Sequence, residues 1–419
     1  MKLANTRSGL VCGLALVAII SQFFRSSISV IAPELIHDLA LTPEMLGLAG
    51  GMFFLAIGLS QVPVGIAFDR IGPRRTLLLI SVFALAGTVV MATATSGRDL
   101  IVGRFLMGLG SGASFISSVV LLMRWYPTER VGTMYGRVFA LSQLGTLLAA
   151  TPLAWLSGWF GWQAVFAGSA VALVIVVGAF YWLVRDHPPD RPPAPPLRES
   201  LGRTLAGYLE VLRQPGYKRV VAVHMFAYAT LATVFGLWAG PYLHDVHGLD
   251  GVARGNVLLM MSIAQVAGML WLVPLERRLN TRKGVIVGAA LVVIATLLVL
   301  ALMAAPPLWL AVSLLVLLSA ASTYSPVIIA HAASLTPPAL LGRGSATANL
   351  GQVTGSFSLP VITGVIAGLF ERSGGGYPAD AYRWIFACLA LGLGTGLAIY
   401  AGVRDLKPRP DGGSPGKPH

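Results

Sequence analysis

Long apolar runs recur twelve times along this sequence. A helix needs about 20 predominantly apolar residues to cross the hydrocarbon core of a bilayer, and each run has about that length. Only 11% of the 419 residues are charged, whereas a soluble domain carries about 25%, so the chain has too few charges to solvate the surface of a soluble protein. We therefore predict an all-α membrane protein with twelve transmembrane helices. The predicted spans are 9–31, 45–68, 75–96, 99–122, 132–156, 162–184, 219–241, 254–275, 284–303, 307–331, 342–369 and 381–403.

Basic residues lie mostly on one side of these spans. If the N-terminus is cytoplasmic, 24 of the 30 Lys and Arg residues fall in cytoplasmic segments and only four fall outside. This distribution follows the positive-inside rule. It predicts a multi-pass protein of the bacterial inner (cell) membrane with both termini in the cytoplasm. The net charge of +13 then reflects topology and contact with membrane lipid rather than a nucleic-acid partner.

A proline-rich segment divides the twelve spans into six and six. The prolines between Asp186 and Pro196 exclude a membrane helix, and the spacing of 197–213 is typical of a helix lying on the membrane surface. Pro127 and Gly132 recur at the same place in the second half as Pro337 and Gly342, as expected for an internal repeat. We predict an N-terminal six-helix bundle at 1–184, a cytoplasmic linker with an interfacial helix at 185–218, a C-terminal six-helix bundle at 219–403 and a disordered cytoplasmic tail at 404–419.

Two short motifs carry glycine and arginine at fixed spacings. Residues 65–75 read G-I-A-F-D-R-I-G-P-R-R, and residues 104–112 read R-F-L-M-G-L-G-S-G. They resemble the two signatures of the major facilitator superfamily, G-x-x-x-D-R-x-G-R-R/K-R/K and R-x-x-x-G-x-G, with Pro73 as the one departure. The resemblance implies two pseudo-symmetric six-helix bundles that work by alternating access. The glycines of the second motif are expected to let helices pack closely.

The resemblance also implies a cytoplasmic gate built on the first motif. Asp69 would accept hydrogen bonds at a neighbouring helix N-terminus or pair with an arginine, and so hold the two halves together when the outside is open. Gly65 and Gly72 are expected to permit close helix approach and a tight turn. The simpler role of Arg70 and Arg74 is to set topology beside anionic lipid.

Two arginines lie inside predicted spans. A helix-centre arginine costs about 2.5–3.5 kcal/mol on insertion scales, so Arg25 needs a function or a partner. Gln22 and Ser29 share its helix face. In the superfamily, spans 1, 4, 7 and 10 line the central cavity, so the resemblance implies that Arg25 binds a carboxylate or phosphate. Alternatively, Arg25 snorkels to the outer interface or binds backbone carbonyls. Arg104 serves proton coupling or cavity organisation by the same resemblance, or anchors the outer interface.

None of the 17 acidic residues lies in the middle of a span, and Glu34 at the outer end of the first span comes nearest. Exporters of cationic drugs usually offer a buried carboxylate, so the charges favour an anionic substrate. The first span also resembles the organic-anion branches of the superfamily, except that Phe24 replaces an aspartate. Further candidates for the cavity are Tyr228, Trp238, Gln265, Tyr324, Asn349 and Gln352; candidates for coupling are Arg104, Glu34 and His224.

These observations predict a secondary transporter of a small organic anion such as a carboxylate, coupled to protons or to exchange and acting as a monomer. The alternatives are a proton-driven multidrug or metabolite exporter with the same fold, and a membrane sensor that does not transport. The sequence contains no acid pair, metal-ligand cluster or nucleophile–base arrangement. We therefore expect neither an enzyme nor a bound metal or cofactor.

Overall fold

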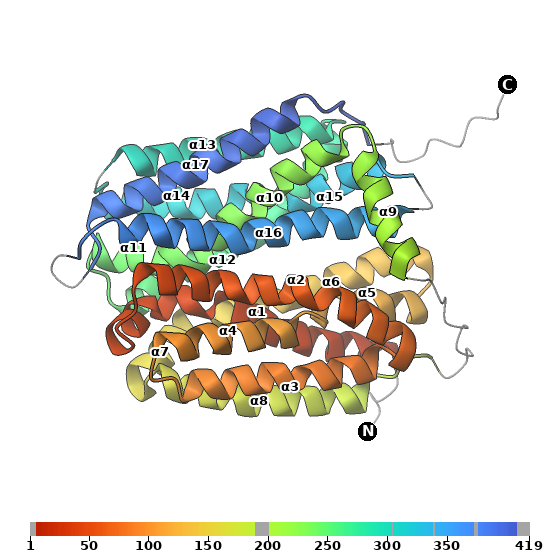
Figure 1. Ribbon diagram of the computed structural model, residues 1–419, viewed down its shortest axis with the longest axis horizontal. Coiled ribbons are helices and arrows are strands. Elements are labelled where there is room, and N and C mark those ends of the chain that lie inside the picture. Colours follow the sequence, from red (N-terminus) through yellow and green to blue (C-terminus); the bar gives the residue numbers. More distant parts are fainter. Residues whose placement is uncertain (1–5, 189–200, 304, 338–339, 373–375, 409–419) are drawn as a thin grey trace. The chain divides into compact units, whose positions relative to one another are not determined.

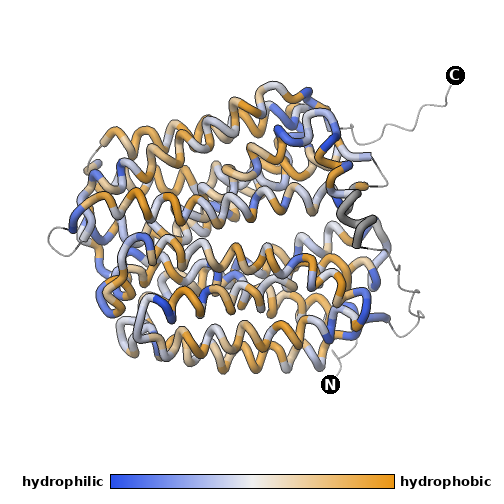
Figure 2. Tube along the Cα trace, viewed as in Figure 1, coloured by the Kyte–Doolittle hydropathy of each residue, from blue (hydrophilic) through white to orange (hydrophobic). Residues whose placement is uncertain are grey.

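Twelve helical segments among the described residues are long and apolar enough to cross a membrane, which confirms the predicted fold class (Figure 1). The computed structural model describes the chain except residues 1–5, 189–200, 304, 338–339, 373–375 and 409–419. Hydrophobic residues follow the helices along their length, and hydrophilic residues gather near the helix ends (Figure 2). Residues 189–200 of the predicted linker lie outside the described residues, and a helix follows them as α9 (Leu201–Arg213). Its position at the membrane surface remains a prediction.

The helices in chain order are α1 (Arg7–Asp38), α2 (Pro43–Ile71), α3 (Pro73–Ala92), α4 (Gly97–Ser111), α5 (Ser114–Trp125), α6 (Thr128–Leu148), α7 (Thr151–Phe160), α8 (Trp162–Leu183), α9 (Leu201–Arg213), α10 (Tyr217–Thr233), the π-helix η1 (Val234–Trp238), α11 (Ala239–Asp245), α12 (Gly251–Arg278), α13 (Arg282–Leu302), α14 (Leu308–Ala321), α15 (Ser325–Ser334), α16 (Leu341–Gly368) and α17 (Ala379–Ala401).

Four of the predicted spans are interrupted rather than continuous. The fourth span consists of α4 and α5, the fifth of α6 and α7, the seventh of α10, η1 and α11, and the tenth of α14 and α15. Pro152 and Pro326 lie in the first turns of α7 and α15, where a missing N–H is tolerated but would break a continuing helix. Prolines thus explain two of the interruptions, and hydropathy alone did not predict them.

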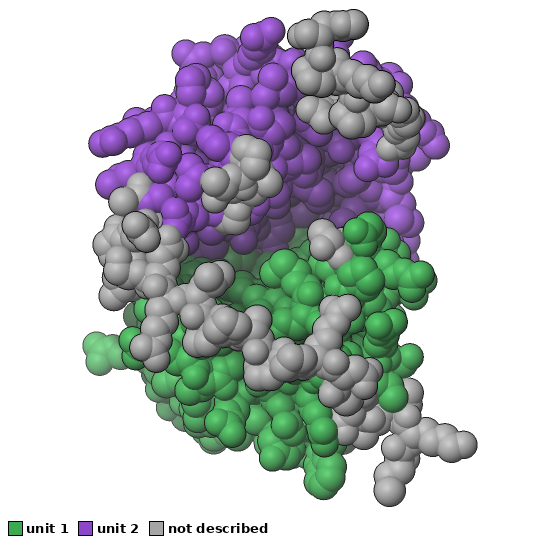
Figure 3. All heavy atoms as spheres, turned by 90° about the vertical axis from the view of Figure 1, so that its right-hand side faces the viewer, with its two compact units in different colours: residues 1–198, 233–262, 357–381 green, residues 199–232, 263–356, 382–419 purple. Residues whose placement is uncertain are grey.

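The chain divides into two compact units, which differ from the two halves of the sequence (Figure 3). Unit 1 contains residues 1–198, 233–262 and 357–381, and unit 2 contains 199–232, 263–356 and 382–419. Unit 1 therefore includes the predicted outer ends of spans 7, 8 and 11 together with the first six spans. Within it, α1 packs on α6 and α8, and α4 packs on α2 and α3. The predicted domain boundaries remain predictions.

Close packing of α4 depends on the glycines of the second motif. A Cβ added to Gly108 would collide with the carbonyl of Phe53 on α2, and one added to Gly110 would collide with the backbone of Ala84 on α3. Small residues at these positions let the helix backbones approach one another. The predicted packing role of these glycines is confirmed.

A Val-Arg-Asp sequence follows the last span of each half, at 184–186 and 403–405. In unit 1, the Asp186 carboxylate accepts a hydrogen bond from the backbone N–H of Arg74 (2.8 Å) near the start of α3. Backbone N–H groups in the first turn of a helix have no partner within the helix and favour a negative charge. Asp186 therefore ties the end of span 6 to the start of span 3.

Asp405 does the same in unit 2, where it ties the end of span 12 to the start of span 9. Its carboxylate accepts hydrogen bonds from Thr281 Oγ1 (2.5 Å) and from the backbone N–H groups of Arg282 (3.2 Å) and Lys283 (3.1 Å). Asp405 lies within the predicted tail of 404–419 and is fixed by these bonds. Residues 409–419 of that tail lie outside the described residues. The matching contacts of Asp186 and Asp405 support the internal repeat.

We expect Asp405→Asn to lower the free energy of unfolding by about 1 kcal/mol at pH 7, as for loss of a helix cap. Burial raises the pKa of Asp405, but the hydrogen bonds from Thr281 and from the Lys283 and Arg282 N–H groups outweigh it and lower the pKa. A carboxylate whose pKa is lower in the folded than in the unfolded protein stabilises the fold fully at a pH above its unfolded-state pKa of about 3.9. This stabilisation is lost as the pH falls through the folded-state pKa. Thermal unfolding is measured at pH 7 and near pH 4. The difference in stability between the Asp405→Asn variant and the native protein should be smaller at the acid pH. The exposed Glu371 provides the control, since Glu371→Gln should change little at either pH.

Candidate functional site

Arg25 lies at the middle of α1 between aromatic rings of neighbouring helices. Its guanidinium carbon is 5.5 Å from the ring centre of Phe54 on α2 and 5.8 Å from that of Phe115 on α5. Tyr135 on α6 lies within electrostatic reach of the same charge. Arginine is attracted to the faces of aromatic rings at such distances. The side chain is thus held among α2, α5 and α6, which disfavours the alternative of snorkelling to the outer interface.

Gln22, one turn before Arg25, carries a polar atom that the protein leaves unsatisfied. Its Nε2 donates a hydrogen bond to Gln143 Oε1 on α6 (2.8 Å), whereas its buried Oε1 has no hydrogen-bond partner among the described residues. A buried acceptor without a donor costs about 1–3 kcal/mol. The α1–α6 side of the Arg25 region therefore has a free acceptor for a hydroxyl or amide donor.

Arg104 is buried and organises the backbone next to Arg25. It is 1% exposed, and its Nη1 donates to the carbonyl of Phe24 on α1 (2.5 Å) while its Nε donates to that of Ala49 on α2 (3.5 Å). Its guanidinium also lies over the ring of Phe53, 4.4 Å from the centre. A buried arginine bonded to two carbonyls holds α1, α2 and α4 together, which favours the organising role over that of an anchor at the outer interface.

Two positive charges consequently act on the same region of unit 1. Arg104 and Arg25 lie close enough for their charges to repel. The hydrogen bonds that Arg104 makes to described residues go to backbone carbonyls, and none of the described carboxylates pairs with it. A low-dielectric environment strengthens such fields. The region around Arg25 therefore favours an anion over a cation.

Ser29 and Trp238 are occupied by helix packing rather than facing open space. Ser29 Oγ accepts a hydrogen bond from the backbone N–H of Gly240 on α11 (3.1 Å). Trp238 on η1 donates from Nε1 to Thr363 Oγ1 on α16 (2.8 Å), and neither Ser29 nor Trp238 is exposed. Both belong to unit 1, and we leave them out of the proposed site because their polar groups are already used.

The remaining cavity candidates belong to unit 2. Tyr324 is fully buried and its hydroxyl has no hydrogen-bond partner. Gln265 is half-buried, and its Nε2 likewise lacks a partner. Tyr228 and Gln352 are half-buried, and Asn349 is exposed. Tyr324 and Gln265 are the stronger candidates of this set, since each offers an unused polar atom.

His224 is locked in a hydrogen-bond network of unit 2. Its Nδ1 lies 3.0 Å from the carbonyl of Ala348 on α16, and its Nε2 lies 2.7 Å from Ser325 Oγ on α15. A carbonyl only accepts, so Nδ1 carries the proton and Nε2 accepts from the serine. The ring is fully buried. This neutral, fully bonded histidine joins α10, α15 and α16, which argues for packing rather than coupling.

We expect His224→Asn to leave the pH dependence of uptake unchanged and to lower the free energy of unfolding by about 1–3 kcal/mol, because buried partners lose a hydrogen bond. Thermal unfolding and a pH profile of uptake into vesicles measure the two effects separately. His37→Asn, at an exposed position on α1, is the matched control. A shifted pH profile in the His224 variant alone would support the coupling role instead.

The predicted outer ends of several helices are joined within unit 1 by contacts of Arg254 and Arg372. Arg254 on α12 is 2% exposed and forms an ion pair with Glu34 on α1. Arg372 donates from Nη2 to the carbonyl of Leu41 (2.6 Å) and lies over the ring of Tyr377. Sequence reasoning missed both arginines, although they are two of only four basic residues on the outer side. Because basic residues are scarce on the outer side, the sequence could have indicated that these arginines have a specific role.

Comparison with known proteins identifies the family. A family model described as Major Facilitator Superfamily matches residues 14–272. The chain belongs to the major facilitator superfamily. It is 25% identical over 298 residues to the "Probable galactarate/D-glucarate transporter" of Escherichia coli (strain K12), covering 64% of this chain and 65% of that protein. It is 24% identical over 302 residues to the "Quinolone resistance transporter" of Acinetobacter baumannii, covering 66% and 68%.

A solved structure supports the same fold. The bacterial homologue of the human lysosomal transporter Spinster matches with a TM-score of 0.76 at 18% identity, over 94% of this chain and 96% of that chain. Such low identity shows the fold alone. The chain spans about two thirds of the length of the first relative. The named members of the superfamily are transporters and not enzymes.

Only some residues of the superfamily's first motif (65–75) make contacts with other described parts of the chain. Gly72 has a φ of +85°, and a Cβ there would collide with the Asp186 carboxylate, so the predicted tight turn is confirmed. No described atom lies within 4 Å of a Cβ added to Gly65, so the predicted close approach at Gly65 is wrong. Asp69 and Arg70 are exposed, and within the described parts of the chain neither makes a hydrogen bond or ion pair. The gate role of Asp69 remains a proposal.

Arg74 has a local role in unit 1. Its Nη2 donates to the backbone carbonyl of Tyr181 on α8 (2.6 Å). Its guanidinium carbon also lies 4.0 Å from the centre of the Tyr181 ring. Together with the backbone bond to Asp186, these contacts attach α3 to the end of α8. Arg74 therefore stabilises the turn that presents Asp69, in addition to any role in topology.

Proposed function

We propose that this member of the superfamily is a secondary transporter of small organic anions, carboxylates in particular, and that Arg25 binds the substrate carboxylate. The observation that carries the proposal is the pair of neighbouring cations, Arg25 and Arg104, of which Arg104 has only backbone carbonyls as its hydrogen-bond partners in the described part of the chain. A guanidinium can bind a carboxylate through two parallel hydrogen bonds. Gln22 would accept a hydrogen bond from a substrate hydroxyl through its unused Oε1. The relative named for galactarate and D-glucarate, two hydroxylated dicarboxylates, supports this chemistry.

Alternating access would move the substrate, one six-helix half rocking against the other. We propose a bacterial inner-membrane location with both termini cytoplasmic, since the basic residues are so unevenly distributed, and a monomer as the working unit. In this proposal the Glu34–Arg254 pair closes the outer end and Asp69 closes the cytoplasmic end in the opposite state. Tyr324 and Gln265 remain the candidate polar residues of unit 2.

Coupling is proposed to run through Glu34. No acidic residue lies in the middle of a span, so a proton that crosses with the substrate has few carboxylates to use. Glu34 Oε2 is buried without a hydrogen-bond partner while Oε1 pairs with Arg254. Opening the outer end would separate this pair and leave Glu34 free to take up a proton. Exchange against a second anion is the alternative, and it would need no titrating group.

The function is tested by thermal unfolding of the purified protein and by uptake into proteoliposomes. Galactarate and D-glucarate serve as anionic probes, a lipophilic cation as the opposite charge, and a quinolone as an aromatic acid. A ligand of the folded state raises the unfolding temperature by mass action. Stabilisation and uptake with the sugar acids support the proposal. Stabilisation by the cation alone would contradict it.

The exporter alternative has one observation in its favour. The rings of Phe54 and Phe115 lie next to Arg25, and a flat aromatic acid would stack on such rings. The relative named for quinolone resistance fits this chemistry. A quinolone that stabilises the protein while sugar acids do not would favour the exporter. Both outcomes retain Arg25 as the anion-binding residue.

A further inference from the structure

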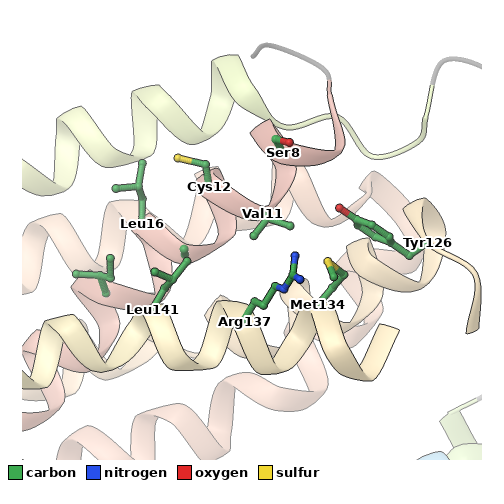
Figure 4. A pocket seen from close by; sticks show the side chains of 10 residues that line it. Ser8, Val11, Cys12, Leu16, Tyr126, Met134, Arg137 and Leu141 are labelled. Carbon is green, nitrogen blue, oxygen red and sulfur yellow. The ribbon is translucent and has the colours of Figure 1, made fainter. Parts of the chain in front are cut away.

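A groove of about 390 Å³ runs along unit 1 between α1 and α6, apart from the Arg25 region (Figure 4). The α1 wall extends from Ser8 to Ile19, the α6 wall extends from Met134 to Leu141, and Tyr126 closes one end. Figure 4 shows Arg137 projecting from α6 toward α1, with Tyr126 and Ser8 toward the same end of the groove. The groove lies at the end of the spans where basic residues concentrate.

The polarity of the groove changes along its length. Leu16, Ile19 and Leu141 line the part that lies deeper in the span, and Ser8 and Arg137 line the part near the helix ends. Ser8 and Ile19 are eleven residues apart in a continuous helix, a rise of about 16 Å at 1.5 Å per residue. One leaflet of a bilayer has a hydrocarbon thickness of about 15 Å, half of the core. The whole groove therefore has about the depth of one leaflet, and its apolar part from Val11 to Ile19 covers about 12 Å of that depth.

The shallow end of the groove is positively charged. Arg7 lies over the Tyr126 ring at 5.6 Å, and the Tyr126 hydroxyl donates to the Arg7 carbonyl (3.2 Å). The charges of Arg7 and Arg137 both act on that hydroxyl. Arg137 is exposed, makes no hydrogen bond or ion pair with the residues that the structure describes, and no carboxylate lines the groove. Arg137 and Ser8 therefore line the end of the groove where a headgroup would lie, and Arg7 lies next to it, over the Tyr126 ring.

We propose that this groove binds one phospholipid with a net negative headgroup, its phosphate between Arg137 and Arg7 and one acyl chain along α1 and α6. A free phosphate would use the cations but leave the apolar walls exposed to water, whereas a phospholipid covers both. The cytoplasmic leaflet is the one richer in anionic lipid and the one that attracts basic residues near the membrane. The bound lipid ties α1, the helix that carries Arg25, to α6.

Alkylation of Cys12 reports directly on the groove. Cys12 lines it and is exposed, and Cys388→Ser removes the other thiol. We expect a maleimide to react with Cys12 about thirtyfold more slowly in phosphatidylglycerol nanodiscs than in phosphatidylcholine nanodiscs, the change that about 1 kcal/mol of attraction from each of two cations gives. Arg137→Gln should reduce the difference to about fivefold, because Arg7 remains. Arg75→Gln, an exposed arginine on α3 away from the groove, should retain the full difference.

Further samples distinguish a bound phospholipid from a free phosphate group. Glycerol phosphate added to phosphatidylcholine nanodiscs should give no protection, because it has no acyl chain. Protection by glycerol phosphate equal to that by phosphatidylglycerol would overturn the lipid assignment. Equal Cys12 reactivity in both lipids, or unchanged protection in the Arg137 variant, would overturn the site. All samples are first checked for a single folded species by size exclusion, so that a misfolded variant is not counted.

Discussion

Arg25→Ala is expected to abolish carboxylate binding and uptake while the protein remains folded. A hydrogen bond to a charged group contributes about 1.5–3 kcal/mol, and Arg25 can offer two in parallel, so the loss in affinity should be about 100-fold or more. The effect is large because Arg104 is a poor substitute: its Nη1 and Nε are held by the carbonyls of Phe24 and Ala49, and the side chain is buried. Binding is measured by thermal shift with galactarate, and transport by uptake into proteoliposomes.

Two further variants sharpen this test. Arg25→Lys keeps the charge but loses the planar fork, so we expect partial binding with weakened discrimination among carboxylates. Arg98→Ala removes an exposed arginine at the N-terminus of α4 and should behave as the native protein. Uptake within twofold of native in the Arg25→Ala variant would show that the substrate binds elsewhere.

Glu34→Ala is expected to open the outer end of unit 1 and to uncouple transport from the proton gradient. The variant leaves Arg254, which is 2% exposed, without its counter-ion. Breaking a fully buried pair costs about 3–5 kcal/mol. The side chain of Glu34 is 41% exposed, so solvent screening makes the cost of breaking this pair smaller than that of a fully buried pair. We therefore expect about a tenfold shift of the equilibrium toward the open state.

Accessibility of a new thiol measures that shift. Ala32→Cys places it on α1 at a position with 0% exposure, in a background with Cys12 and Cys388 replaced by serine. An impermeant maleimide should label this thiol about tenfold faster in the Glu34→Ala variant. Glu44→Gln, an exposed carboxylate at the start of α2, is the control. The reversed pair, Glu34→Arg with Arg254→Glu, should restore slow labelling, and failure to restore it would argue against the ion pair as the latch.

Uptake under an imposed pH gradient tests the coupling separately from the latch. Glu34→Gln keeps an acceptor for Arg254 but cannot take up a proton. If Glu34 carries the proton, this variant should show uptake that no longer responds to the gradient while exchange of bound anion continues. An unchanged response would assign coupling to another group or to exchange. It would not contradict the role of the Glu34–Arg254 ion pair in closing the outer end.

The candidate site was only partly predictable from the sequence. Arg25 and Gln22 were found because a charge within a span is costly and helical spacing puts both on one face. Ser29 satisfies the same spacing, yet its hydroxyl is used by the Gly240 N–H. His224 has a suitable titration range, yet both ring nitrogens are already bonded. Helical spacing places a residue on a face but does not state which neighbour covers that face.

The number of spans, the family and the predominance of positive charge on one side follow from the sequence, because insertion into a bilayer depends on hydropathy and charge that are read residue by residue. The tertiary structure decided which polar groups are already paired. Glu34 and Arg254 are 220 positions apart, and Arg104 meets the carbonyl of Phe24 80 positions away. Such pairs form because membrane helices bring distant residues together and a buried polar group must find a partner there. Only the packing of the helices determines which partner it is.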